Sequence, residues 1–546
     1  MPRELTPLPG EMRWWGWGDP ARPPALPEHA LDFLRGEVGI SPSPRPPVAL
    51  EEVTLPEPAL PEAARAALEA VAHLRDDRVA RVHHAAGKGY VDLVRQRAGD
   101  ASQAPDAVVY PGGHDEVRGA LEACAAAGVA VVPFGGGTSV VGGVEPLRGD
   151  FEAVIALDLG RLDRLVGVDR TSLTAVLEAG LRGPEAEKAL NAEGLTLGHF
   201  PQSYEYASIG GYVATRSAGQ ASTGYGRVDE LVLGLRCAAP AGDLDARPLP
   251  ASAAGPKLRE LLVGSEGTLG VITQAAFRVR PAPAERRYEG WFFRSFAEGA
   301  EAFRALEQHE AAPDVARLSD EDETRLSLAL AGGEGLKARA GAAYLRLRRY
   351  EGGCLAILGW EGDADAVASR AARTAAVARR GGGLSLGRSP GEAWARGRYE
   401  GPYLRDDLLA HGLLVETLET ATQWSGVLDL HEGVRAALRD ALSARGTPPL
   451  VMCHISHLYP SGASLYFTFL ARAQEGGELE QWRAAKHAAS DAIATRGATI
   501  THHHAIGRDH LPWMEAEVGA LGLDALRAVK ERLDPAGIMN PGKLLP

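Results

Sequence analysis

The chain has 546 residues, of which 45% are hydrophobic and 24% charged, a balance typical of soluble globular proteins with several domains. Its formal net charge of −13 argues against a nucleic-acid-binding protein, because such proteins carry a basic surface. The four cysteines are scattered without a CxxC pair, so neither a disulfide framework nor a zinc ribbon is predicted. The sequence has neither a membrane-spanning apolar run nor a secretory signal, and a cytoplasmic location is predicted.

Residues 1–85 are predicted to form a proline-rich arm and helices, since segments such as "SPSPRPPVAL" are typical of extended linkers. Trp14, Trp15 and Trp17 interrupt this arm. Two interpretations are open: the aromatic rings pin the arm onto the main body, or they form a patch that faces a membrane.

Residues 86–283 have the pattern of an α+β domain. Strands are predicted at 106–111 and 129–134, with a helix between them that ends at Gly128. Residues 284–500 mix strands with long Ala/Arg-rich helices and are predicted to form a second α+β domain. Residues 501–546 begin with three consecutive histidines and form a C-terminal segment.

The stretch "PFGGGTSVVGG" follows the strand at 129–134 directly. Consecutive glycines let the backbone approach a ligand closely and present N–H groups to phosphate. Val140 stands where a Rossmann fingerprint needs its third glycine, and the lysine of a P-loop is absent. The loop therefore indicates either a different phosphate-binding fold or only a tight turn.

Two further stretches are rich in small residues, "SIGGYVATRSAGQ" at 208–220 and "GSEGTLGVIT" at 264–273. Small side chains suit a backbone that wraps around a large flat ligand. Together with "LDPAGIMNPGKLL" at 533–545, these stretches resemble the vanillyl-alcohol oxidase / p-cresol methylhydroxylase (PCMH) superfamily over about residues 80–546. The resemblance implies an α+β fold, with a two-part PCMH-type FAD-binding domain, an α+β substrate (cap) domain over the flavin, and non-covalent FAD.

Within this superfamily, "RWWGWG", "SYEYASIGGYVATRSAG", "SGASLYFTF" and "HHHAIG" are similar to the alkyldihydroxyacetonephosphate synthases, the enzymes that form ether lipids. That similarity implies exchange of the acyl group of acyl-dihydroxyacetone phosphate for a long-chain fatty alcohol. It also implies lipid substrates, a homodimer, and peripheral contact with a membrane without a transmembrane helix.

The resemblance assigns FAD contacts to four short segments. They are Pro133, Phe134, Gly135, Gly136, Gly137, Thr138 and Ser139; Gln202, Ser203, Tyr204, Glu205, Tyr206, Ala207 and Ser208; Thr215, Arg216, Ser217 and Ala218; and Glu266, Gly267, Thr268, Leu269, Gly270, Val271 and Ile272. The sequence departs from the family pattern at Phe200, where an acidic residue is common, and at Gln202, where aspartate is usual.

The resemblance also assigns the chemistry. Tyr466 is the expected acid/base residue, and Arg317 and Arg405 are the expected ligands of the substrate phosphate, which a guanidinium fork suits well. The remaining expected catalytic residues are His199, His502, His503 and His504. A phenol with a pKa near 10 acts as a base only if cations or hydrogen bonds lower that pKa. From the sequence alone, Tyr466 could as well be a structural tyrosine in the core or on the face of a sheet. The two arginines could as well form ion pairs at the surface.

Two other functions remain open: oxidation of a D-2-hydroxy acid by FAD, with histidines or a divalent metal holding the carboxylate, and a flavin-binding scaffold without catalysis. In an extended segment, neighbouring side chains point to opposite faces, so His502, His503 and His504 cannot easily converge on one ion. The sequence therefore predicts an imidazole cluster beside the flavin and no metal.

Overall fold

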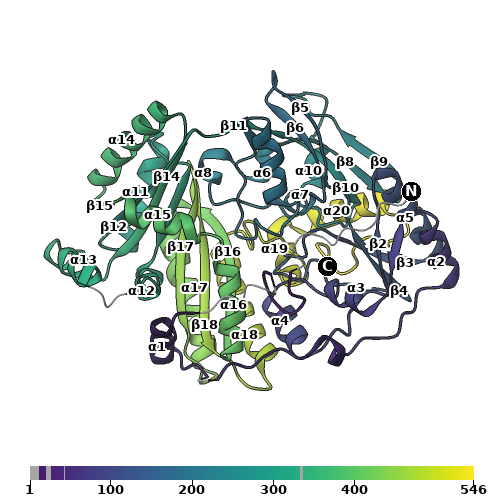
Figure 1. Cartoon of the computed structure of the whole chain (residues 1–546), viewed down its shortest axis with the longest axis horizontal. Coiled ribbons are helices and arrows are strands. Elements are labelled where there is room, and N and C mark those ends of the chain that lie inside the picture. Colours follow the sequence, from purple (N-terminus) through teal and green to yellow (C-terminus); the bar gives the residue numbers. More distant parts are fainter. Residues whose placement is uncertain (1–11, 20–25, 42, 333–335) are drawn as a thin grey trace.

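The computed structural model describes residues 12–19, 26–41, 43–332 and 336–546, and within them the predicted α+β class is confirmed. Figure 1 shows two lobes side by side. The first lobe holds a four-stranded and a five-stranded sheet, and the second lobe holds a seven-stranded sheet. No helix in these ranges is both long and apolar enough to cross a membrane.

The four-stranded sheet has the order β1-β2-β4-β3, in which β2, β4 and β3 are parallel. The five-stranded sheet has the order β5-β6-β10-β8-β9 and is antiparallel. The strands of this lobe are β1 His73–Arg75, β2 Ala107–Tyr110, β3 Val129–Phe134, β4 Ala153–Asp158, β5 Leu165–Asp169, β6 Thr174–Glu178, β7 Leu195–Thr196, β8 Val232–Ala239, β9 Gly242–Ala246, β10 Val271–Arg278 and β11 Arg280–Pro281.

Helices of the first lobe follow the sequence signals at their ends. The helix expected before the glycine loop ends at Gly128, whose φ of 63° is the left-handed geometry that favours glycine at a C-cap. The helices that precede β12 (Glu285–Phe293) in the sequence are α1 Glu28–Glu37, α2 Glu62–Glu69, α3 Arg78–His83, α4 Tyr90–Arg97, α5 His114–Ala127, α6 Gly183–Ala192, α7 Ile209–Thr215, α8 Ser222–Tyr225, α9 Val228–Leu231 and α10 Arg259–Leu262.

The seven-stranded sheet of the second lobe is antiparallel, with the order β15-β12-β14-β13-β17-β18-β16. Its strands are β12 Glu285–Phe293, β13 Val315–Ser319, β14 Cys354–Gly362, β15 Leu384–Gly387, β16 Leu413–Gln423, β17 Leu450–Tyr459 and β18 Gly462–Arg472. The later helices are α11 Phe296–Gln308, α12 Glu321–Leu330, α13 Leu336–Leu347, α14 Ala364–Arg380, α15 Arg388–Gly397, α16 Gly401–Ala410, α17 Val427–Ser443, α18 Glu478–Thr495, α19 Met514–Val518 and α20 Ala520–Leu533.

The two faces of this sheet have different surroundings. One face is apolar and packs against α11, α14, α17 and α18; on β18 it contributes Leu465, Phe467 and Phe469, all fully buried. Because side chains alternate along a strand, Tyr466 and Thr468 point to the opposite face, where they line a large cavity. Tyr466 is therefore a sheet-face residue, one of the two placements that the sequence left open.

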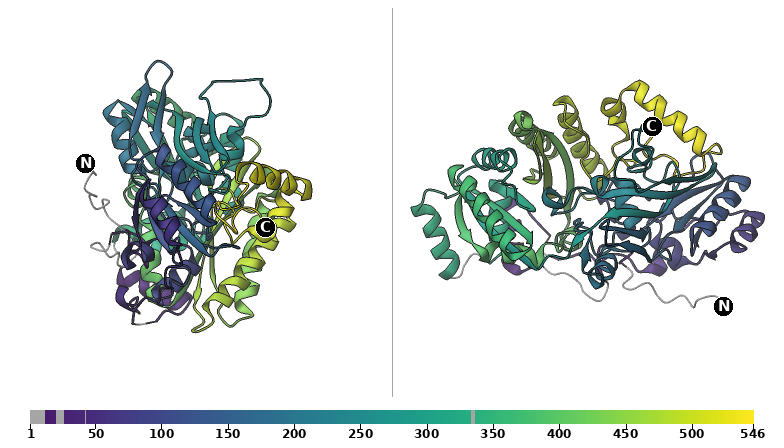
Figure 2. Two further views of the ribbon diagram at one scale, coloured as in Figure 1. Left: turned by 90° about the vertical axis from the view of Figure 1, so that its right-hand side faces the viewer. Right: turned by 90° about the horizontal axis from the view of Figure 1, so that it is seen from above.

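Both ends of the chain connect the lobes. Trp14 and Trp17 are buried, Arg13 pairs with Asp406 on α16 at 3.3 Å, and the Lys88 ammonium donates to the carbonyls of Arg13 and Trp14. These contacts agree with the interpretation that the aromatic residues pin the arm. The C-terminal segment, yellow in Figures 1 and 2, returns to the first lobe, where the Val131 N–H donates to the Ile538 carbonyl at 2.8 Å.

A core substitution tests the packing of the second lobe. Phe303 on α11 is fully buried and meets Phe293 edge-on, with ring centroids 6.3 Å apart. Phe303→Ala is expected to cost about 3–5 kcal/mol, because the lost ring leaves a cavity. Leu521→Ala, at a side chain that is 82% exposed, is the control and should change stability by less than about 0.5 kcal/mol. Equal melting temperatures for the two variants would contradict this packing.

Candidate functional site

A cavity of about 1410 Å³ lies between the lobes. The glycine loop and the start of α7 form one wall, and the polar face of the seven-stranded sheet forms the opposite wall. Helices α12, α13, α15 and α16 also contribute to its lining. Single-ligand pockets are roughly 300–1,000 Å³, so this cavity has room for a cofactor together with a substrate.

The glycine loop is packed so closely that side chains are excluded from it. A Cβ atom on Gly136 would lie 1.9 Å from the Tyr206 carbonyl oxygen, and one on Gly135 would lie 2.2 Å from the Ser208 hydroxyl. Gly137 has a φ of 65°. Bare backbone therefore faces the cavity beside the N-terminus of α7, which fits the binding of a flavin pyrophosphate.

The structure brings together only part of the predicted FAD-binding set. The members of this set that line the cavity are Gly135, Gly136, Gly137, Thr138, Ser139, Gln202, Ser203, Ala207, Ser208, Thr215, Ser217 and Ala218. The other members are outside the lining: Pro133, Phe134, Tyr204, Glu205, Tyr206, Arg216 and residues 266–272. Arg216, for example, donates to the Val263 carbonyl at 3.0 Å, and the Phe134 ring packs on His84.

Strand register sets the position of Tyr466. Tyr466 on β18 pairs with His454 on β17 and with Glu419 on β16, so the three residues form one row across the sheet. The Tyr466 ring stacks on His454 at 4.9 Å and lies 6.0 Å from His503. Burial raises the pKa of Tyr466 to about 12, so at neutral pH it is an uncharged phenol.

The three histidines form a tight turn that is held through its backbone. Glu419 accepts hydrogen bonds from the amides of His502, His503 and His504, the last two at 2.9 and 2.6 Å. From the first lobe, Glu266 accepts from the amides of Ile506 and Gly507 at 2.8 and 2.7 Å. One buried carboxylate from each lobe thus fixes the same turn, and both do so through backbone amides.

Of the four predicted histidines, His503 and His504 line the cavity, whereas His199 and His502 are buried outside its lining, and all four imidazoles are neutral. Burial lowers the pKa of His503, of His504 and of His199 to about 3 each, and it lowers the pKa of His502 well below the ordinary value. Neutral rings add no positive charge that would lower the pKa of Tyr466; each instead carries one ring nitrogen whose lone pair can accept a hydrogen bond. Nδ1 of His199 and Nδ1 of His504 are buried without a hydrogen-bond partner, whereas Nε2 of His199 is bonded to the Ser217 hydroxyl at 2.8 Å.

Both predicted phosphate ligands line the cavity, and each is already paired with a carboxylate. Arg317 donates to Glu323 at 2.8 Å and contacts Nε2 of His454 at 3.1 Å. Arg405 is 6% exposed and donates to Glu416 at 3.0 Å, while its Nε has no partner. These pairs hold the guanidinium groups in place against the sheet.

Several site residues were not predicted from the sequence, and His457 is the clearest case. His454 and His457 are three residues apart, so in a regular strand they would point to opposite faces. The register of β17 against β18 shifts between Ile455 and Leu458, and this bulge turns both histidines into the cavity. A sequence analysis that assumes strict alternation of side chains along the strand therefore cannot assign both His454 and His457 to the cavity.

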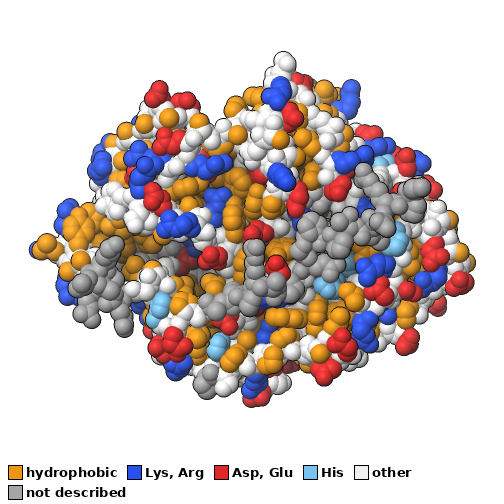
Figure 3. Space-filling model, in the orientation of Figure 1, with side chains coloured by type: hydrophobic (Ala, Val, Ile, Leu, Met, Phe, Trp, Pro, Cys, Tyr) orange, Lys and Arg blue, Asp and Glu red, His pale blue; other side chains and the backbone are white. Residues whose placement is uncertain are grey.

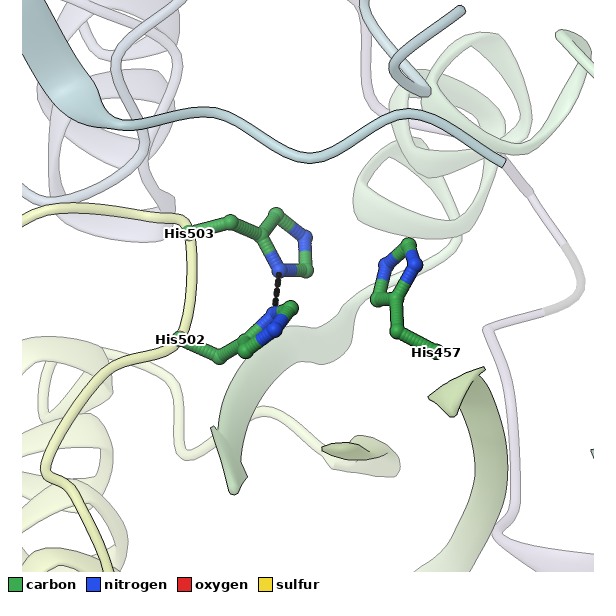
Figure 4. A group of neighbouring side chains, drawn as sticks. All are labelled: His457, His502 and His503. Carbon is green, nitrogen blue, oxygen red and sulfur yellow. Dashed lines mark hydrogen bonds between the residues drawn. The ribbon is translucent and has the colours of Figure 1, made fainter. Parts of the chain in front are cut away.

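Figure 4 shows His457, His502 and His503; one ring nitrogen of each lies within 4.8 Å of the chosen nitrogens of the other two. The rings of His457 and His502 are nearly parallel, with planes 24° apart and centroids at 5.0 Å. Lone pairs in nearly parallel planes do not converge on one point, so this arrangement would need ring rotation before it could bind a metal ion. The absence of a metal stays a prediction.

Comparisons with known proteins cover the whole chain. A family model described as "FAD binding domain" matches residues 105–245, and one described as "FAD linked oxidases, C-terminal domain" matches residues 282–544. The chain is 32% identical to alkyldihydroxyacetonephosphate synthase of Dictyostelium discoideum, over 100% of this chain and 95% of the relative. It is 34% identical to the enzyme of the same name from Trypanosoma brucei brucei, over 100% and 94%.

Among solved structures, an alkyldihydroxyacetonephosphate synthase in a P212121 crystal is similar with a TM-score of 0.84 and 29% identity, over 98% of this chain and 99% of that one. These matches confirm the predicted superfamily fold and FAD as the cofactor.

Glu266 gives the site a pH-dependent stability. Burial raises the pKa of Glu266 from an ordinary 4.5 to about 7. The folded chain therefore binds more protons at this group than the unfolded chain between these values, so its contribution to stability falls as the pH rises through that range. The contribution changes by up to about 3 kcal/mol.

Melting temperatures of wild type and Glu266→Gln between about pH 5 and pH 7.5 test this linkage. We expect the wild type to lose stability relative to the variant as the pH rises. Glu28→Gln, at a side chain that is 78% exposed, is the control and should parallel the wild type. Parallel curves for wild type and Glu266→Gln would contradict the raised pKa.

Proposed function

The chain belongs to the family of alkyldihydroxyacetonephosphate synthases, and we propose on this premise that it exchanges the acyl group of acyl-dihydroxyacetone phosphate for a long-chain fatty alcohol. The observation that carries this proposal is the lining of the cavity. The same cavity holds Tyr466, His503, His504 and the two arginines together with a set of apolar residues that we call the apolar wall. That wall comprises Leu326, Leu330, Leu345, Leu404, Leu408, Met452 and Leu470.

An apolar wall of this kind suits a fatty chain, because burial of each CH₂ group contributes about 0.8 kcal/mol. A small hydroxy acid would need only a compact polar pocket. The cavity therefore favours acyl exchange over oxidation of a D-2-hydroxy acid.

Residues of the first lobe would hold the cofactor. The backbone of Gly135–Ser139 would bind the FAD pyrophosphate, and Ser208, Thr215, Ser217 and Ala218 would lie along the rest of the molecule. When bound, FAD supplies the isoalloxazine ring against which C1 of the substrate is held.

The second lobe would bind and orient the substrate. Arg317 and Arg405 would take the phosphate, since each keeps N–H groups beyond those used by its carboxylate partner. His503 and His504 would accept the proton that leaves C1, because both line the cavity and are unprotonated before the reaction. Tyr466, which stays protonated, would donate a hydrogen bond to an oxygen that becomes negative.

We further propose that the protein is a cytoplasmic homodimer that contacts membranes peripherally at α13. Leu347 and Tyr344 on α13 are 81% and 43% exposed, and Leu328 on α12 is 49% exposed. Figure 1 places α13 at the left end of the molecule, and Figure 3 shows hydrophobic side chains gathered at that end. Arg346 and Arg348 flank them, and Tyr344 also lines the cavity. A membrane in contact with this end would deliver lipids close to the cavity.

The direct test of the function is incubation of the purified holoprotein with acyl-dihydroxyacetone phosphate and hexadecanol. We expect alkyl-dihydroxyacetone phosphate and free fatty acid in equal amounts. Anaerobic bleaching of the flavin by a D-2-hydroxy acid, without any alkyl product, would contradict the proposal and favour the oxidoreductase.

His503→Ala tests the role of the histidine turn. It should lower kcat by about 10²–10⁴-fold, because a positioned base contributes that much. The flavin absorbance of the purified variant should equal that of wild type, since the backbone of the turn stays bound to Glu419. His487→Ala, on the exposed face of α18, is the control and should keep full activity. An active His503→Ala enzyme would remove this histidine from the chemistry.

A further inference from the structure

The proposed reaction leaves one proton over in each turnover. The bond between C1 and the acyl oxygen breaks, the bond between C1 and the alcohol oxygen forms, and the fatty acid leaves. At neutral pH the acid leaves as a carboxylate, because its pKa is near that of other carboxyl groups. The hydroxyl proton of the alcohol therefore has to reach solvent from a buried site.

A continuous hydrogen-bonded chain leads away from the cavity at this point. His503 lines the cavity, and its Nδ1 lies 2.9 Å from Nδ1 of His502. Nε2 of His502 lies 2.6 Å from the Tyr459 hydroxyl. His502 is 5% exposed, and neither it nor Tyr459 is among the described residues that line the cavity. The chain thus runs through the cavity wall.

Tyr459 lies at the end of β17 and is half-buried. Next to it are Arg227 and Asp229, an ion pair at 3.4 Å in which both side chains are about one-fifth exposed. A proton that reaches the Tyr459 hydroxyl is therefore close to solvent and to a carboxylate. Solvent access from the cavity side is poor when a fatty chain fills the apolar part.

On these observations, and on the premise of the proposed function, we propose that His503, His502 and Tyr459 form a relay that carries the surplus proton out of the cavity. A proton is taken up at Nε2 of His503, and the proton at its Nδ1 passes to Nδ1 of His502. The proton at Nε2 of His502 passes to the Tyr459 oxygen, and the hydroxyl proton of Tyr459 passes to solvent. Each group gains one proton and loses one.

Tyr459→Phe removes the last member of the relay and keeps its ring. We expect kcat to fall by about 10-fold or more, while KM for both substrates and flavin binding stay unchanged. The solvent deuterium isotope effect on kcat should rise, and added imidazole buffer should restore part of the rate. Tyr350→Phe is the control, because it likewise removes a tyrosine hydroxyl that makes a short hydrogen bond, here to the Gly382 carbonyl at 2.6 Å, outside the proposed relay.

A kcat equal to that of wild type would overturn the relay. So would a loss of rate without a change in isotope effect and without rescue, since that result indicates a packing role only.

A second measurement does not depend on turnover. In holoprotein without substrate, the ¹⁵N shifts of the His502 ring report its tautomer, and Tyr459→Phe should change them while Tyr350→Phe should not. Unchanged shifts would overturn the relay. If the shifts change but wild type makes no alkyl product, the proposed function fails and the hydrogen-bonded chain stands.

Discussion

The site depends on one interaction, the binding of the turn at residues 501–507 by two buried carboxylates from opposite lobes. Glu419 on β16 takes three successive amides, and Glu266 takes two more. The backbone amides, rather than the imidazoles, carry these bonds. The same bonds tie the second lobe to the first, so the cavity and its catalytic groups are assembled together.

Burial explains the electrostatics of the site. An acidic chain can still offer cations to a phosphate, because Glu323 and Glu416 hold Arg317 and Arg405 at the sheet surface. The imidazoles, in contrast, are uncharged, because burial lowers their pKa values. The two faces of the seven-stranded sheet have different roles. The apolar face packs against helices and stabilises the lobe, and the polar face lines the cavity and carries the site residues.

Much of this was predictable from the sequence. The glycine loop, the strand before it and the positions of Tyr466, His503 and His504 in one cavity were expected from motifs and resemblance. Glu266 was expected to contact FAD, but its carboxylate binds backbone amides of the turn, a contact between residues 240 positions apart that no local pattern encodes. His457 was missed because a β-bulge cancels the alternation that sequence reading assumes. The raised pKa of Tyr466 follows from burial, which only the fold reveals.

Hydrogen exchange tests the central claim most directly. The amides of residues 502–507 belong to a turn without regular secondary structure, yet five of them are bonded to carboxylates. In the holoprotein, a peptide that covers residues 501–508 should exchange slowly, and Glu419→Gln should accelerate that exchange by about 10-fold or more, since roughly 1.4 kcal/mol of lost protection has this effect. Exchange as fast as that of the exposed segment 250–258, or exchange that the substitution leaves unchanged, would contradict the claim.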